Sequence, residues 1–232
     1  MIASALGACV FPQSGNTQAN VQRDFIEWHR GRPRYAVWAI DLADDVFISQ
    51  RIAEAQSLLS PYLLPGYRCQ PHITLHVCGF PAQVQHHDDD YLPEQFRRQI
   101  DVLQTAGLGN FSLRVQGAGS FTTAPYFRVV DDKAMLPLLR QCLAVAGGDW
   151  RETPFVPHVT IGLYGGCHDF QDVASEVCLL QAMPDLGLTV SHLSLMTYDS
   201  AVVGGPLETL CRFDLANNLL ETSPSFSQFS SP

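Results

Sequence analysis

Hydrophobic residues recur with the period of a strand in some segments of the chain and with the period of a helix in others. The run RYAVWAI at 34–40 predicts a strand. Apolar residues at helical spacing across 48–59 predict a helix after it, capped by Asp44 or Asp45. A strand at 73–78 completes this strand–helix–strand unit.

A second unit with the same order follows later in the chain. It comprises a strand at 126–130, a helix capped by Asp131 or Asp132, and a strand at 155–163. The remaining patterns predict a helix that begins near Pro93, a strand at 111–115, a helix at 170–180, and strands near 188–197 and 207–215. The chain therefore carries a weak internal duplication, and two similar units packed about a pseudo-twofold axis would bring their last strands toward one cleft.

The ends of the chain lack this regularity. Residues 1–33 are expected to form an N-terminal arm, 34–216 a two-lobed domain, and 217–232 a C-terminal tail rich in Ser, Pro and Phe. The length of 232 residues suits one domain or two small lobes that share a core. No apolar run approaches the roughly 18 residues that a membrane-spanning helix needs, so a membrane protein is not expected.

Charge narrows the classes of partner. The formal net charge is −9, and the basic residues are thirteen arginines and one lysine. Sequence-indifferent binding of long nucleic acid rests on many cation–phosphate contacts, so no long nucleic acid is expected as a partner. A small nucleotide or an RNA end held by a few arginines remains compatible with this charge. The seven cysteines are scattered and form no CxxC pair, which predicts the reducing cytoplasm as the location.

The two units end in the same short pattern. The first ends in Pro-His72-Ile-Thr74 and the second in Pro-His158-Val-Thr160, each followed by an aliphatic residue. With 8 His and 11 Thr in 232 positions, chance predicts about 0.4 His-x-Thr triplets, and far fewer with the preceding proline. The pair is therefore a strong signal for a functional site. We favour this interpretation over the alternative that the two are core histidines with their hydrogen bonds made inside the protein.

Strand geometry predicts the direction in which these histidine and threonine side chains point. Residues i and i+2 of a strand point to one face, roughly 7 Å apart, while residue i+1 points to the other. His72 and Thr74 would then share a face, as would His158 and Thr160. Two such strands across a cleft place two imidazoles and two hydroxyls around a common volume.

This set suits in-line displacement at a phosphodiester. The attacking oxygen needs a base and the leaving oxygen needs an acid, and imidazole can serve as either near neutral pH. Threonine hydroxyls can donate to the non-bridging oxygens. No metal ion or other cofactor is required, so we expect activity in excess EDTA and a bell-shaped pH–rate profile.

The paired motifs, with a helix and a strand before each, resemble the two-histidine (2H) phosphoesterase superfamily, in particular its RNA 2′,3′-cyclic phosphodiesterase and 2′-5′ RNA ligase branch. The resemblance extends to segments 119–121, 151–155 and 200–204. It implies an α+β fold of two pseudo-symmetric lobes, whose antiparallel sheets flank a central groove and whose helices lie on the outer faces. The sequence departs from the family pattern at Leu163, where a basic residue is common, and near Leu207, where an aromatic residue is common.

The resemblance implies that His72, Thr74, His158 and Thr160 are the catalytic residues of a hydrolase that opens 2′,3′-cyclic phosphates or related 2′-linked phosphodiesters. Which histidine is the acid is left open. Arginine suits phosphates and bases, His76 would share a strand face with His72 and Thr74, and tyrosines can stack on a base. Six further residues are therefore candidates for substrate contact: Arg68, His76, Tyr126, Arg128, Arg151 and Tyr164.

Two alternatives use the same residues. A 2′-5′ RNA ligase would run the reaction in reverse, since microscopic reversibility permits both directions, but it must hold two RNA ends on an acidic protein. A binding module would recognise the phosphodiester without turnover, and the intact His and Thr of both motifs argue against it.

Overall fold

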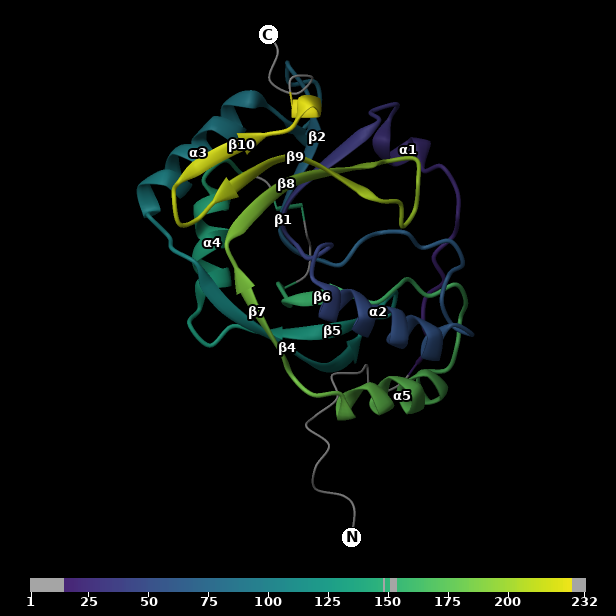
Figure 1. Ribbon diagram of the computed structural model, residues 1–232. Coiled ribbons are helices and arrows are strands. Elements are labelled where there is room, and N and C mark those ends of the chain that lie inside the picture. The colour runs from purple at the N-terminus through teal and green to yellow at the C-terminus, as the bar shows by residue number, and fades with distance from the viewer. Residues whose placement is uncertain (1–14, 148, 151–153, 227–232) are drawn as a thin grey trace.

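The computed structural model describes residues 15–147, 149–150 and 154–226. Within these ranges the protein has an α+β fold built on two curled sheets, as the resemblance implies (Figure 1). The larger sheet has the strand order β10-β9-β8-β1-β2-β3, with β1 (Arg34–Asp41), β2 (His72–Pro81), β3 (Asp90–Tyr91), β8 (His192–Asp199), β9 (Leu207–Asp214) and β10 (Leu219–Thr222). Its neighbouring strands are antiparallel except for the short parallel pair of β2 and β3.

The smaller sheet is wholly antiparallel, in the order β6-β5-β4-β7. Its strands are β4 (Phe111–Ser120), β5 (Pro125–Val130), β6 (His158–Thr160) and β7 (Leu186–Val190). The helices are α1 (Ile26–His29), α2 (Val46–Leu59), α3 (Pro93–Ala106), α4 (Met135–Ala144) and α5 (Phe170–Leu179), with short 3-10 helices at Leu180–Ala182 and Pro224–Phe226. None of these described helices is long and apolar enough to cross a membrane.

Two of the described helices, α2 and α5, begin at an aspartate that caps them. The carboxylate of Asp45 accepts from the Ile48 N–H at the start of α2, and Asp169 accepts from Gln171 N–H at the start of α5. Pro93 occupies the first turn of α3, where its missing N–H costs nothing. At α4 the carboxylate of Asp131 accepts from Leu136 N–H at 2.6 Å, although Ala134 is the residue that precedes the helix.

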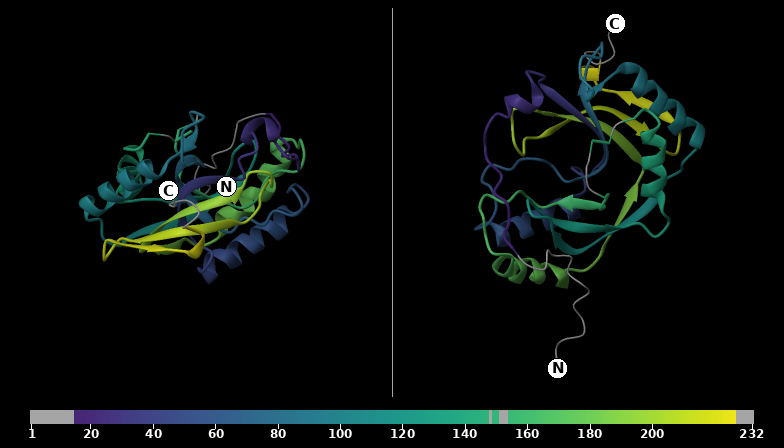
Figure 2. Two further views of the ribbon diagram at one scale, coloured as in Figure 1. Left: turned by 90° about the horizontal axis from the view of Figure 1, so that it is seen from above. Right: turned by 180° about the vertical axis from the view of Figure 1, so that it is seen from behind.

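The helix of each unit forms hydrogen bonds to the sheet of the other unit. α2 connects β1 to β2 of the larger sheet, yet its Arg51 and Gln56 donate to the carbonyls of Val115 and Ile161 in the smaller sheet and just beyond it. α4 connects β5 to β6 of the smaller sheet, yet its Arg140 donates to the carbonyl of Leu75 in β2 at 2.6 Å. Figures 1 and 2 show α2 beside α5 and α4 beside α3. This exchange ties the two halves together.

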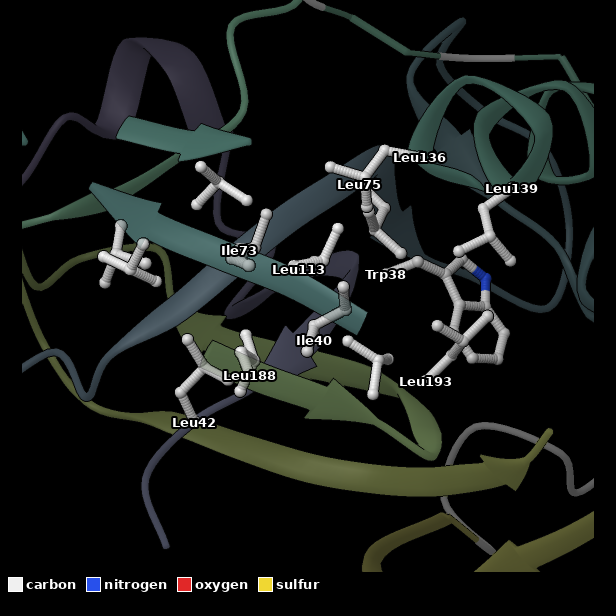
Figure 3. Packing of buried hydrophobic residues seen from close by; sticks show 14 of the residues in the cluster. Trp38, Ile40, Leu42, Ile73, Leu75, Leu113, Leu136, Leu139, Leu188 and Leu193 are labelled. Atoms are coloured by element: carbon white, nitrogen blue, oxygen red, sulfur yellow. The ribbon is translucent and has the colours of Figure 1, made fainter. Parts of the chain in front are cut away.

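One hydrophobic core therefore serves both sheets. Figure 3 shows side chains of the larger sheet, such as Trp38 and Ile73, packed with Leu113 of β4 and Leu139 of α4. Each of these is nearly or fully buried. Burial of a large apolar side chain stabilises the fold by about 1.5–3 kcal/mol, so this cluster holds the two sheets in a fixed relation.

A buried amide organises the polar atoms inside this core. Gln99 of α3 is fully buried, and its Oε1 accepts from Trp38 Nε1 at 2.9 Å and from the Tyr91 hydroxyl at 2.5 Å. Its Nε2 donates to the Leu143 carbonyl at 2.7 Å. Because unsatisfied polar groups in a core are costly, this side chain specifies how β1, β3, α3 and α4 meet.

The structure corrects two predicted strands. The strand expected near 188–197 is two strands, β7 and β8, which belong to different sheets and meet at Ser191. The strand expected at 155–163 is paired only over His158–Thr160. Three short elements, α1, β3 and β10, were not predicted, and β10 forms a hairpin with β9 within the segment expected as a tail.

Residues 15–33 lie along both halves of the molecule before β1 begins (Figure 1). Thr17 bonds to the backbone of Gly166 and His168, and the Asn20 amide donates to the carbonyls of Thr123 and Tyr164. At the other end the guanidinium of Arg32 pairs with Asp89 and Asp90 beside β3. Residues 15–33 therefore form part of the described structure on both sides of the molecule.

Candidate active site

The first His-x-Thr pair lies at the start of β2. His72 pairs with Asp41 and Thr74 pairs with Ala39 of β1, so both side chains lie on the same face of the larger sheet. Ile73 between them is fully buried on the opposite face. The alternation expected from the sequence holds here.

The second pair makes up β6, an edge strand of the smaller sheet. His158 pairs with Arg128 and Thr160 pairs with Tyr126 of β5, while Val159 is fully buried between them. His158 and Thr160 therefore also share a face, and Arg128 and Tyr126 lie on that face beside them.

Side chains from the two strands meet around one pocket. His72 and Thr74 of β2 and Thr160 of β6 line a cavity of about 310 Å³. His158 lies two residues before Thr160 on the same strand face. β2 and β6 are in contact, and Leu64 N–H just after α2 donates to the Leu163 carbonyl just after β6 at 2.7 Å. The fold thus brings the two distant motifs to the same place.

The two histidines are oriented in the same way. Nδ1 of His72 bonds to the carbonyl of Gln70 at 2.9 Å, and Nδ1 of His158 bonds to the carbonyl of Val156 at 2.6 Å. A carbonyl can only accept, so each Nδ1 carries the proton of the neutral ring. Nε2 is then the nitrogen of each neutral ring that is left free of a proton.

The proline before each histidine explains this orientation. Proline fixes its own φ and restricts the residue before it to extended backbone, so the carbonyl two positions before the histidine is held near the ring. The proline carbonyls also anchor each strand, because Leu42 N–H donates to Pro71 and Val129 N–H donates to Pro157, each at 3.0 Å. The same local geometry therefore recurs in both halves.

Comparison with known proteins agrees with this geometry. A model of the 2′-5′ RNA ligase superfamily matches residues 45–201 of the chain. The chain belongs to this superfamily of two-histidine phosphoesterases. No curated protein sequence matches it.

Solved structures show the same fold at low identity. Escherichia coli LigT complexed with 3′-AMP is 18% identical, with a TM-score of 0.51, and the match covers 78% of this chain and 98% of LigT. LigT complexed with NADP+ is 17% identical, with a TM-score of 0.50, and covers 79% of this chain and 99% of that one. At this identity the likeness supports the fold.

The two superfamily histidines have different surroundings. Burial lowers the pKa of His72 from its ordinary value near 6.5, while the bond to the Gln70 carbonyl and the negative charge of Asp41 act in the opposite direction. His158 instead lies edge-on to two aromatic rings, Phe121 at 5.0 Å and Tyr126 at 5.3 Å between centroids.

Two of the six candidate contact residues lie beside the second motif. Arg128 is opposite His158, and one of its guanidinium nitrogens lies 3.4 Å from Gln181 Oε1. Tyr126 is only 2% exposed and stacks on Phe121 at 4.3 Å between centroids. Tyr126 therefore supports the His158 ring from within the structure, and Arg128 is the cation nearest to it in the strand register.

His76 does not line the groove. A β-bulge inserts Leu75 as an extra residue in β2, since Thr74 pairs with Ala39 and His76 pairs with the adjacent Trp38. The extra residue turns His76 to the core face, where it is 1% exposed. The expectation that His76 shares a face with His72 and Thr74 is wrong for this reason.

Tyr164 is a core residue rather than a substrate contact. It is fully buried, and its hydroxyl bonds to Ser120 Oγ at 2.7 Å. Arg68 is exposed, and its backbone N–H donates to the Gly204 carbonyl, while its neighbours Tyr67 and Cys69 line the pocket. Arg151 lies outside the described residues.

Several residues of the pocket had no signal in the sequence. Phe25 and Trp28 come from the segment before β1, and Tyr67 and Tyr198 come from other parts of the chain. Leu163 and Leu207, the two departures from the family pattern, line the same pocket. Only the fold reveals the four aromatic neighbours, because none belongs to a short motif.

The His86–Asp90 segment has a structural role. Asp90 is buried, accepts from the N–H groups of His86 and His87, and pairs with Arg32 at 2.9 Å. In the part of the chain that the structure describes, no group of three or more His, Cys, Asp or Glu side chains is arranged to hold a metal ion.

Proposed function

We propose that this protein hydrolyses 2′,3′-cyclic phosphates of nucleotides or RNA ends by acid–base catalysis with His72 and His158. The observation that carries this proposal is the matched orientation of the two rings: each histidine bonds through Nδ1 to a carbonyl two residues earlier, beside a threonine that lines or borders one pocket. A site that only bound phosphate would not need two imidazoles set up in the same tautomer.

The proposed step is an in-line displacement. A water oxygen forms a bond to phosphorus as the bond from phosphorus to the ribose 2′ or 3′ oxygen breaks. One imidazole accepts, at its Nε2, the proton that the water loses. The other ring, as an imidazolium, gives a proton to the departing ribose oxygen. Proton exchange with solvent restores both rings.

The surroundings of the histidines support one assignment of these roles. Burial lowers the pKa of His72, so its ring is neutral near pH 7 and can accept the proton of water. His158 is then the acid that protonates the leaving oxygen.

The threonines and Arg128 complete the proposed machinery. The hydroxyls of Thr74 and Thr160 donate to the non-bridging oxygens, where negative charge accumulates in the transition state. Arg128, across from His158 in the strand register, supplies a positive charge toward the same phosphate.

The size and charge of the site favour hydrolysis over ligation. A pocket of about 310 Å³ is at the small end of ligand pockets and suits one nucleotide unit. Many of the described arginines pair with carboxylates elsewhere on the surface, as Arg114 does with Asp132 and Asp185, and so provide no track for a second RNA end. LigT was solved with 3′-AMP, which is one of the two monoesters that opening of adenosine 2′,3′-cyclic phosphate yields.

The test is a substrate panel. The purified protein is incubated in EDTA with 2′,3′-cyclic mononucleotides, oligonucleotides ending in a cyclic phosphate, and 2′-5′ dinucleotides, and the products are separated by chromatography. We expect monophosphate products from the cyclic substrates, with turnover lost in His72→Ala and His158→Ala. Joined products would support the ligase, and a complex without turnover would support a binding module; either result overturns the proposal.

A further inference from the structure

The pocket has a polar end and an apolar end. His72, Thr74 and Thr160 form the polar end. The rest of the lining is largely aromatic or aliphatic, including Phe25, Trp28, Tyr67, Tyr198, Val202 and Leu207. The substrate's phosphate belongs at the polar end, so the apolar end receives whatever part of the substrate is attached to it.

The aromatic residues at the apolar end are held in place. Trp28 packs against Tyr35 and Phe80 at 4.9 Å and 5.1 Å between ring centroids, yet remains 38% exposed. Tyr67 lies against Gly204, whose φ is +66° and where a Cβ would come within 2.7 Å of the tyrosine ring. These rings offer fixed, accessible π surface at little cost in conformational entropy.

The segment that carries Phe25 and Trp28 is tied to the opposite wall. The Gln22 amide donates to the Val203 carbonyl at 3.3 Å, and Ser200 Oγ donates to the Arg32 carbonyl at 2.5 Å. Both the segment before β1 and the wall at Val202, Val203 and Leu207 lie outside residues 45–201, which match the superfamily. The apolar end thus combines parts of this chain beyond the matched region with Tyr67 and Tyr198 inside it.

Two polar side chains at this end are engaged within the protein. Ser200 bonds to the Arg32 carbonyl, and the Tyr67 hydroxyl bonds to Cys69. A base read by hydrogen bonds to its edge needs polar groups free to pair with it, whereas stacking needs only a flat aromatic face.

We propose that Trp28, Phe25 and Tyr67 form a stacking site for the nucleobase of the substrate, so that the segment before β1 determines which cyclic phosphates the enzyme prefers. This inference rests on the proposed function for the position of the phosphate. It predicts that a purine or a pyrimidine is accepted, with purines favoured for their larger face, and that a sugar phosphate without a base binds poorly.

Direct binding tests this without relying on turnover. Calorimetry measures the Kd of 3′-AMP and of ribose 3-phosphate, which has no base, for the wild type and for Trp28→Ala, Phe25→Ala and Phe47→Ala. Phe47 is an exposed phenylalanine of α2 away from this pocket and serves as the matched control. Thermal unfolding checks that each variant folds, and Trp28→Phe, which keeps a ring against Tyr35 and Phe80, replaces Trp28→Ala if the latter does not.

The wild type should bind 3′-AMP at least about tenfold more tightly than ribose 3-phosphate. Trp28→Ala and Phe25→Ala should weaken 3′-AMP binding about tenfold and leave ribose 3-phosphate unchanged, Trp28→Phe should weaken it less, and Phe47→Ala should change neither. Equal affinity of the wild type for the two ligands, absence of 3′-AMP binding, or variants that bind 3′-AMP like the wild type would overturn the stacking site. Base-dependent binding in a protein that hydrolyses no cyclic phosphate would instead contradict the proposed function alone.

Discussion

The two strands that carry the histidines share a motif but differ in their place in the fold. β2 is a ten-residue strand with a neighbour on each side, and His72 lies on it beside Asp41. β6 has three residues, lies at the edge of its sheet, and presents His158 to the rings of Phe121 and Tyr126. The local bonds are the same, since each Nδ1 is fixed by a carbonyl two residues earlier.

Under the proposed function, this difference would let a duplicated motif supply two different catalysts. The motif sets the tautomer of each ring, while the surroundings set its affinity for a proton. Partial burial lowers the pKa of His72, which suits the base that we propose, and His158 is then the proposed acid. Variants of the two strands distinguish whether their roles are equivalent, opposite or unrelated.

Removal of either ring should have the largest effect. General acid–base groups contribute about 10²–10⁴-fold, so His72→Ala and His158→Ala should each lower kcat for cyclic phosphates by that order. Steady-state kinetics measures this, and circular dichroism shows whether the fold persists. His192→Ala, in an exposed part of β8, should keep wild-type kcat. Wild-type turnover in both His72→Ala and His158→Ala would contradict the proposed catalytic role of the two histidines.

Loss of either hydroxyl should rank next. Thr74→Val and Thr160→Val keep the branched shape but remove a donor to the non-bridging oxygens, so we expect kcat to fall about 10²–10³-fold in each. Thr189→Val, an exposed threonine of β7, is the control. A loss in only one of the two variants would show that the two strands do not hold the phosphate symmetrically.

A substitution that shifts the Tyr126 ring packed against His158 should lower kcat less, and only through β6. A Cβ at Gly119 would lie within 2.8 Å of the buried Tyr126 ring, which packs against His158. Gly119→Ala should therefore displace His158 and lower kcat about tenfold. Gly187→Ala in β7 meets no atom within 4 Å and should leave kcat unchanged. Equal rates in the two variants would contradict a supporting role for Tyr126.

The charge beside His72 should change the pH profile more than the maximal rate. Asp41 raises the pKa of His72 against the effect of burial, so Asp41→Asn should lower that pKa further. The base then stays neutral to lower pH, and the acidic limb of kcat/KM moves to lower pH. Asp44→Asn removes the same charge from a 95% exposed position and should leave the limb in place. An alkaline limb that moves to lower pH in Asp41→Asn, with the acidic limb in place, would instead assign His72 as the acid.

The sequence predicted those features that depend on local periodicity. The alternation around His72 and His158 placed each His and Thr on one face, and the capping aspartate and apolar spacing located α2 within a few residues. These properties follow from the period of a strand or a helix, which short stretches of sequence display.

The features that were missed depend on contacts between distant segments or on one extra residue. The bulge at Leu75 reversed the face of His76, because counting by twos assumes an unbroken strand. The composition of residues 188–197 favours a strand, so it gives no sign that the chain passes from one sheet to the other at Ser191. Trp28 reached the pocket only because residues 15–33 are bonded to segments more than a hundred positions away.

The most direct test of the central claim is a substrate whose leaving group needs no acid. In 3′-deoxyadenosine 2′-(4-nitrophenyl phosphate) the departing nitrophenolate is stable without a proton, so only the base is needed. Comparison of kcat/KM for this diester and for adenosine 2′,3′-cyclic phosphate should show His158→Ala close to wild type on the nitrophenyl diester and impaired on the cyclic phosphate, with His72→Ala impaired on both. Equal impairment of His158→Ala on the two substrates would contradict the view that β2 and β6 place a base and an acid on the same phosphorus atom.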